Sequence, residues 1–297
     1  MQALWMLLAT FLFSLMGVCV KLASETYSTA ESVSYRGAIG VLGLLILIKW
    51  QGGTLRTDYL AGHVWRGLFG VVSLWLWFYS MSKLPLSLAV TLAYMSSIWV
   101  ALILFAKSWW QQRGRQPVHL APSLVWAILL GFLGVVLLLR PTIRVEQVGD
   151  SFIALVSGFV AALAYLQVRE MGLRGEPEYR VVFYFSGFCL VAGIVGHYFQ
   201  VNTYSTSQLA AHSNAHLMEP AGLALLLGVG VTATIAQLAM TRAYRLGNPL
   251  VAANLQYVGI VFTSGLDLWI WKLSLSWISW LGIAVILTSG MIATTYG

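Results

Sequence analysis

Ten long apolar runs divide this chain, and they constrain its fold more than any other feature. They cover about residues 3–22, 33–49, 65–83, 87–107, 121–139, 149–168, 181–199, 220–241, 249–270 and 274–295. Each run is close to the ~20 residues that an α-helix needs to cross ~30 Å of hydrocarbon. Helices are favoured over strands because the runs lack an alternation of period two. The sequence therefore predicts an all-α integral membrane protein with ten transmembrane helices.

The composition agrees with a lipid solvent. Only 9% of the 297 residues are charged, whereas soluble domains carry about a quarter. The net charge of +7 is then best explained by Lys and Arg in cytoplasmic loops rather than by a nucleic-acid-binding surface. Cys19 and Cys189 lie within apolar runs, which predicts buried thiols and neither a disulfide framework nor a metal site. No motif indicates a cofactor or a nucleotide, so none is expected.

The distribution of Lys and Arg predicts the orientation. With the N-terminus in the cytoplasm, eleven of the 17 Lys and Arg residues fall on the inner side and six on the outer side. This bias favours cytoplasmic positions for both termini. The first apolar run is predicted to be a retained helix because no cleavage signal accompanies it. The longest connection, 200–219, then faces outward and carries no Lys or Arg.

A weak internal repeat relates the two halves of the chain. When the sequence is shifted by 163 residues, Thr91 aligns with Asn254 and Tyr94 with Tyr257. Both pairs lie in the fourth span of a half. Five spans per half make the halves enter the membrane from opposite sides, which is the inverted repeat of many secondary transporters. The predicted repeats are residues 1–145 and 146–297.

Three stretches are similar to bacterial drug/metabolite transporters of the EamA type. They are "RGLFGVVSLWLWFYSMSKLPLSLAVTLAYMSSIWVALIL" (66–104), "GFLGVVLLLRP" (131–141) and "AMTRAYRLGNPLVAANLQYVGIVFTSGL" (239–266). The resemblance implies a ten-helix bundle in the inner membrane that moves a small organic metabolite, such as an amino acid, amine or nucleobase, by alternating access. It favours export over import. One departure is that "FAKSWWQQRGRQP" (105–117) lacks the glutamate that relatives usually carry after the fourth span.

Polar and aromatic residues inside the spans are the candidates for solute binding, because a buried polar group needs a partner or a wet cavity. Each repeat tyrosine lies about 11 Å in from the end of its span, close to the midplane. The aromatic residues would provide stacking and hydroxyls, and the two amides would orient the solute. The alternatives are hydrogen bonds between helices for the polar residues and an aromatic belt for Trp75. The predicted substrate-binding residues are Trp75, Tyr79, Tyr94, Tyr165, Gln237, Asn254 and Tyr257.

Other polar positions have simpler explanations. Lys21 and Arg36, near the outer span ends, could hold an anionic group, but extension of the side chains to the interface is the simpler interpretation. "WRG" (65–67) is interpreted as an anchor at the inner surface. Gln256 points about 100° away from Tyr257, which favours a bond between helices. The glycines 37, 40 and 43, and likewise 131 and 134, predict close helix contacts.

All ten acidic residues lie at or near span ends, so a buried proton relay is not expected. Uniport, exchange or coupling through a terminal acid such as Glu170 or Asp267 would fit. Two alternatives stay open at this point: a membrane-embedded enzyme using the charged cluster around Glu176, and a non-transporting membrane scaffold. The expected partners are a small-molecule solute and the lipid bilayer, with no nucleic acid; a homodimer is one option for the assembly.

Overall fold

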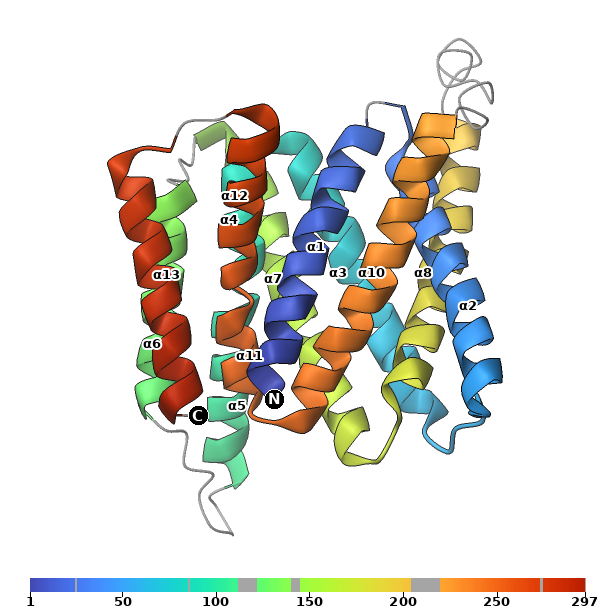
Figure 1. Ribbon diagram of the computed structural model, residues 1–297, viewed down its shortest axis with the longest axis horizontal. Coiled ribbons are helices and arrows are strands. Elements are labelled where there is room, and N and C mark those ends of the chain that lie inside the picture. Colours follow the sequence, from blue (N-terminus) through green and yellow to red (C-terminus); the bar gives the residue numbers. More distant parts are fainter. Residues whose placement is uncertain are drawn as a thin grey trace.

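The structure is a computed structural model of an α-helical bundle (Figure 1), and it describes residues 1–24, 26–84, 86–111, 122–139, 145–203, 220–272 and 275–296. Its helices are α1 (Gln2–Ala23), α2 (Thr29–Gln51), α3 (Leu60–Lys83), α4 (Leu86–Tyr94), α5 (Ser96–Gln111), α6 (Pro122–Leu139), α7 (Val148–Leu173), α8 (Glu178–Thr203), α10 (Pro220–Leu246), α11 (Pro249–Leu255), α12 (Val258–Trp271) and α13 (Trp277–Tyr296), with a 3-10 turn, η1 (Val145–Gln147), before α7. Eight segments of the described chain are long and apolar enough to cross a membrane. The predicted all-α membrane fold is confirmed.

Two of the predicted spans are not single helices. The fourth consists of α4 and α5, which are separated at Met95, and the ninth consists of α11 and α12, which are separated at Gln256 and Tyr257. The sequence predicted one continuous helix for each. Pro85, residues 112–117 of the 105–117 stretch and residues 204–219 of the long connection lie outside the described residues.

Both chain termini lie at one end of the bundle, here called the terminal end (Figure 1). The helix α1 packs on α10 and α12, whereas α7 packs on α3 and on α4 and α5; α2 pairs with α8, and α6 with α13. The contacts are the same when each span of the first five is exchanged with its counterpart in the last five. In this exchange α1 corresponds to α7, α2 to α8, α3 to α10, α4 and α5 to α11 and α12, and α6 to α13. This pattern is compatible with the inverted repeat, which stays a prediction.

Glycines allow helices to approach closely at the predicted positions 37, 40, 131 and 134, but not at Gly43, where an added Cβ atom would meet nothing within 4 Å. A Cβ atom added to Gly37 of α2 would lie 2.4 Å from the backbone nitrogen of Leu190 in α8. One added to Gly134 of α6 would lie 2.9 Å from the carbonyl oxygen of Gly282 in α13. Such distances are too short for any real Cβ contact, so both contacts require glycine.

Local sequence signals set several helix ends. The N-terminus of α2 has a capping box: the Ser28 amide donates to the Glu31 carboxylate at 2.7 Å, and the Glu31 amide donates to the Ser28 hydroxyl at 3.3 Å. Helix α11 begins with Asn248 as its N-cap and Pro249 in its first turn. The cap at Asn248 sets the residue at which α11 begins.

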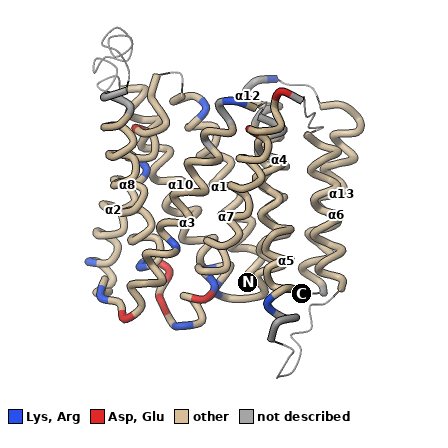
Figure 2. Tube along the Cα trace, turned by 180° about the vertical axis from the view of Figure 1, so that it is seen from behind, with Lys and Arg blue, Asp and Glu red and all other residues tan. Residues whose placement is uncertain are grey.

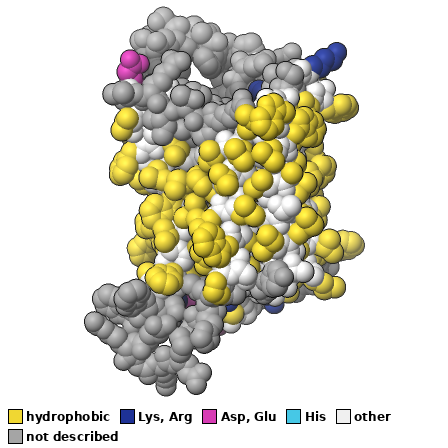
Figure 3. All heavy atoms as spheres, turned by 90° about the vertical axis from the view of Figure 1, so that its left-hand side faces the viewer, with side chains coloured by type: hydrophobic (Ala, Val, Ile, Leu, Met, Phe, Trp, Pro, Cys, Tyr) yellow, Lys and Arg dark blue, Asp and Glu magenta, His cyan; other side chains and the backbone are white. Residues whose placement is uncertain are grey.

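The outer surface of the bundle is apolar between its two ends. Figure 3 shows hydrophobic side chains covering the middle of the face formed by α6 and α13. Trp126 of α6 is 70% exposed and Met291 of α13 is 61% exposed. A continuous apolar face of this kind is suited to contact with lipid chains rather than water.

Candidate functional site

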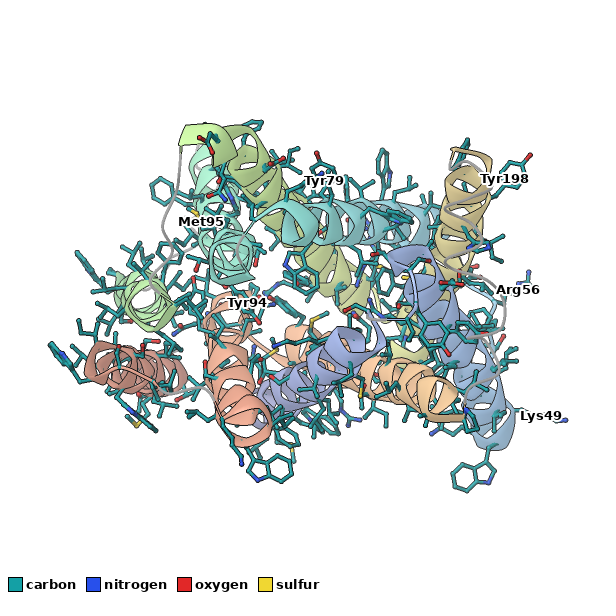
Figure 4. All side chains as sticks on the ribbon, turned by 90° about the horizontal axis from the view of Figure 1, so that it is seen from above. Lys49, Arg56, Tyr79, Tyr94, Met95 and Tyr198 are labelled. Carbon is teal, nitrogen blue, oxygen red and sulfur yellow. The ribbon has the colours of Figure 1, made fainter. Side chains whose placement is uncertain are left out.

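The two broken helices meet in the middle of the bundle. The rings of Tyr94, at the end of α4, and Tyr257, at the start of α12, have centroids 6.3 Å apart and are tilted by 36°. The Ser97 hydroxyl of α5 donates to the Ala253 carbonyl oxygen of α11 at 2.6 Å. We call the place where the two breaks meet, defined by the Tyr94–Tyr257 ring pair and the Ser97–Ala253 bond, the crossing. Figure 4 shows Tyr94 pointing inward between the two broken helices.

The backbone tightens at each break instead of unwinding. The Met95 amide donates to the Leu92 carbonyl at 3.2 Å, and the Tyr257 amide donates to the Asn254 carbonyl at 3.1 Å. Such i to i−3 bonds are those of a 3-10 turn. Tightening changes which carbonyls are available to other helices, and the Gly259 carbonyl accepts a bond of 2.9 Å from Ser14 of α1.

The crossing brings together part of the predicted site. Tyr94 and Tyr257 come to one place, as the repeat predicted. Tyr165 of α7 stacks on Tyr244 of α10 with ring centroids 5.5 Å apart. The Gln256 amide donates to the Tyr244 hydroxyl at 3.0 Å, which confirms the predicted bond between segments for Gln256.

The side chain of Asn254 is hydrogen-bonded to a neighbouring helix. This side chain is 1% exposed, and its amide nitrogen donates to the Ser289 carbonyl of α13 at 2.9 Å. The Ser289 hydroxyl donates back to the amide oxygen of Asn254 at 3.2 Å. The helix face was predicted correctly, but in this structure the partner of Asn254 is α13. This is the alternative of a bond between helices.

The aromatic residues of α3 do not join the crossing. The Trp75 ring fills the space beside Gly196 of α8, where an added Cβ atom would lie 2.3 Å from the ring. Tyr79 is 46% exposed and lies on the outer side of α3 (Figure 4). The four-residue spacing predicted that Trp75 and Tyr79 share one helix face. In the structure the Trp75 ring packs on α8, whereas the Tyr79 side chain is largely exposed. The structure therefore does not bring Trp75 and Tyr79 to the other candidates.

Two narrow clefts lie between helices of the part of the bundle that holds α1, α2, α3, α8 and α10. One is bounded by α2, α8 and α10, and Gln237 is among its lining residues. The other is bounded by α1, α2, α3 and α10. Arg36 lines both clefts. The amide nitrogen of Gln237 is buried and has no hydrogen-bond partner among the described residues.

Two arginines converge on one phenylalanine ring beside these clefts. The guanidinium carbon of Arg66 lies 4.1 Å from the centroid of the Phe185 ring, and that of Arg36 lies 5.5 Å from it. Arg66 is only 3% exposed, and its Nε and Nη1 atoms have no hydrogen-bond partner among the described residues. The interpretation of "WRG" as a surface anchor was therefore wrong for Arg66. The reason is that α3 begins at Leu60, which places Arg66 more than one turn inside the helix.

The ring alone does not offset the burial of the Arg66 charge. A desolvated cation–π contact is worth about 2 kcal/mol. The effective cost of burying an unpaired ion is several kcal/mol. The described Asp and Glu residues form ion pairs with His63, Arg174, Arg180 and Arg245, and with neither Arg36 nor Arg66. In Figure 2 the acidic segments lie at the two ends of the bundle, whereas basic segments also occur between them.

Comparison with known proteins supplies the family. The model of the EamA-like transporter family matches residues 1–140. The pseudopaline exporter CntI of Pseudomonas aeruginosa strain PAO1 is 31% identical over 267 residues, which cover 89% of this chain and 84% of the exporter. The chain belongs to the EamA-like transporter family.

Further relatives agree with this assignment. An uncharacterized transporter of Helicobacter pylori strain 26695 is 26% identical over 293 residues, or 96% of this chain and 92% of that protein. A crystal structure with 17% identity superposes with a TM-score of 0.80 and covers 100% of this chain and 99% of its own, which shows a shared fold. The EamA-like protein is thus a membrane transporter of a small solute, and the alternatives of an enzyme and of a scaffold are set aside.

The EamA-like transporter also has a polar link between two loops at its terminal end. Glu176, between α7 and α8, is 7% exposed and accepts a bond from the Thr57 hydroxyl. Its other oxygen lies 2.9 Å from Arg180 Nη1 and 3.3 Å from His63 Nε2. Arg180 also donates two bonds to the Thr54 carbonyl, at 3.1 and 3.0 Å. Within the charged cluster, the Glu176 carboxylate is thus a buried connection between the 52–59 and 174–177 loops, whereas the Glu170–Arg174 pair is exposed.

Proposed function

We propose that the protein exports a small organic metabolite across the bacterial inner membrane by alternating access, with both termini in the cytoplasm. The observation that carries the mechanism is the crossing, where two spans break at Met95 and at Gln256 and Tyr257, and where the rings of Tyr94 and Tyr257 lie 6.3 Å apart. Discontinuous helices near the midplane are the typical setting of solute sites in secondary transporters. The name of the pseudopaline exporter supports a small exported solute.

The packing of the bundle supports a movement of two halves. The proposed halves are residues 1–145 and 146–297. Helix α1 of the first half packs on α10 and α12 of the second, and α7 of the second packs on α3, α4 and α5 of the first. Rocking of the halves would therefore open or close the space around the crossing. The two clefts are narrow in this structure, so transport requires such an opening.

Four of the predicted residues are suited to the solute path in this proposal. Tyr94 and Tyr257 form the contact that must separate when the path opens. Tyr165 stacks on Tyr244, which is bonded to Gln256 at the break, and Gln237 has an unpartnered amide in the α2–α8–α10 cleft. We assign the other three, Trp75, Tyr79 and Asn254, to helix packing and to the outer surface.

Counterflow in proteoliposomes tests this function. Vesicles are loaded with a pool of amino acids, amines, nucleobases and organic acids, and exchange is measured by mass spectrometry. The double variant Tyr94→Phe/Tyr257→Phe removes two hydroxyls from the crossing. We expect its exchange rate to fall about tenfold or more, which is the effect of losing about one hydrogen bond in the path.

Tyr79→Phe is the matched control, because it makes the same chemical change on the outer surface of α3. Its exchange rate should equal that of the wild type. Uptake into everted vesicles would then show the export direction. The proposal fails if the wild type exchanges no solute of the pool, or if the double variant exchanges as fast as Tyr79→Phe.

A further inference from the structure

Arg36 and Arg66 reach the same ring from opposite ends of the bundle. Arg36 is seven residues after the first residue of α2, about 10 Å from the end opposite to the termini. Arg66 is six residues after the first residue of α3, about 9 Å from the terminal end. Both guanidinium groups nevertheless lie over Phe185 of α8. Two cations are thereby held close together within the bundle.

The surrounding residues make room for this pair. A Cβ atom added to Gly70 would lie 2.1 Å from Nη1 of Arg66, so any larger residue there would displace the guanidinium. Gly37 follows Arg36 and, with Ala233, leaves the α2–α8–α10 cleft lined by small side chains beside Arg36. The buried amide nitrogen of Gln237 is a further donor in the same cleft.

The site therefore contains donors and positive charge but no described anion. Arg66 Nε and Nη1 and Gln237 Nε2 are buried N–H groups without a partner among the described residues. Buried donors in native proteins are nearly always satisfied. The planar guanidinium matches the geometry of a carboxylate, to which it can donate two parallel bonds. A carboxylate would satisfy the donors and offset the charge at once.

We propose that Arg36, Arg66 and Gln237 form a binding site for a carboxylate of the transported solute, with Phe185 as the surface on which the arginines are held. This assignment rests on the proposed function, because it names the chemical class of that solute: an organic acid or a zwitterion with at least one carboxylate. A site reached by one arginine from each end also suits a solute that must be held while access alternates.

Thermal unfolding of the purified protein in detergent tests the site without transport. The probes are succinate and citrate, with succinamide as the neutral analogue and sodium chloride and inorganic phosphate at matched ionic strength. We expect succinate or citrate to raise the unfolding midpoint, and succinamide and chloride to leave it unchanged. In Arg66→Gln and Arg36→Gln the half-maximal concentration of the carboxylate should rise roughly tenfold or more.

Two further observations separate binding from a structural role. Without a ligand, Arg66→Gln should unfold at the same temperature as the wild type or higher, because it removes a buried charge that lacks a partner. Arg242→Gln is the matched control: its guanidinium carbon lies 4.6 Å from the Trp5 ring, and Arg242 lines neither cleft. It should respond to carboxylates as the wild type does.

The proposal is overturned if succinamide, chloride or phosphate stabilises the protein as well as the carboxylates do, or if both arginine variants keep the wild-type response. Counterflow of the same compounds distinguishes the two proposals. If carboxylates stabilise the protein through the arginines but are not exchanged, the site stands and the transport function is wrong. If the exchanged solutes all lack a carboxylate, transport stands and the carboxylate site is wrong.

Discussion

Neutralising Glu176 should weaken the link between the two loops at the terminal end. The carboxylate is 7% exposed and accepts bonds from Thr57, Arg180 and His63. Glu176→Gln keeps the shape of the side chain but removes its charge. One carboxylate oxygen is replaced by an NH2 group, which would face donors of Thr57, Arg180 or His63. Hydrogen bonds to a charged group are worth about 1.5–3 kcal/mol each and are not additive. Because Arg180 and Thr57 keep partial access to water, we expect a loss of about 2–3 kcal/mol in the free energy of unfolding.

Reversible unfolding in mixed detergent micelles at pH 7 measures this loss. Glu170→Gln is the control, because Glu170 also pairs with an arginine four residues away, Arg174. The side chains of that pair are 41% and 52% exposed, so it should contribute at most about 0.5 kcal/mol. Equal effects of the two substitutions would refute the reasoning from burial.

The same contact predicts a dependence on pH. Burial on its own would raise the pKa of the Glu176 carboxyl, but the hydrogen bonds from Thr57, Arg180 and His63 hold the pKa below its ordinary value of 4.5. A carboxyl with a lowered pKa contributes stability that is complete above the unfolded-state pKa and is lost as the pH falls through the folded-state pKa. The difference between wild type and Glu176→Gln should therefore be constant above pH 5 and shrink below about 4.5.

Three further predictions concern helix contacts. Asn254→Ala should lower the free energy of unfolding in micelles by about 2 kcal/mol, because it removes both hydrogen bonds to residue 289. Ser289→Ala should cost less, because residue 289 keeps the backbone carbonyl that accepts the bond from the Asn254 amide. Gly37→Ala should reduce folded yield because its Cβ atom would meet the backbone of α8 at 2.4 Å, whereas Gly43→Ala meets nothing within 4 Å and should fold as the wild type does. Ser97→Ala removes the bond of 2.6 Å at the crossing and should change the exchange rate more than the midpoint of thermal unfolding.

The sequence predicted the spans well because length and apolarity are strong local signals. It did not predict the breaks in the fourth and ninth spans, because neither break contains the glycine or proline that usually marks one: the residues are Met95, and Gln256 with Tyr257. The side-chain bonds around these turns come from other helices, as Ser14 of α1 donates to the Gly259 carbonyl and Ser97 of α5 to the Ala253 carbonyl. No pattern within the span itself carries that information.

Side-chain partners were the other limit. Helical spacing correctly placed Asn254 on an inward face, but it could not distinguish a solute from α13 as the partner. Arg66 was assigned to the inner surface because the apolar run starts near residue 65, whereas the helix starts at Leu60. Ala61, Gly62 and His63 are small or polar, so the apolar run does not include the first turn of the helix. The burial of Arg66 follows from tertiary packing against Phe185, for which Gly70 of the same helix leaves room.

Two buried side-chain hydrogen bonds link the ninth span to different helices on either side of its break. Its α11 segment is joined to α13 through Asn254, whereas its α12 segment is joined to α1 through Ser14 and the Gly259 carbonyl. Both α1 and α13 also pack against each segment, so a displacement of α1 relative to α13 would have to break one of these bonds or bend the span at Gln256 and Tyr257. These two positions form a joint, and a pair of spectroscopic probes on α11 and α12 would change its angle or distance even when neither segment deforms.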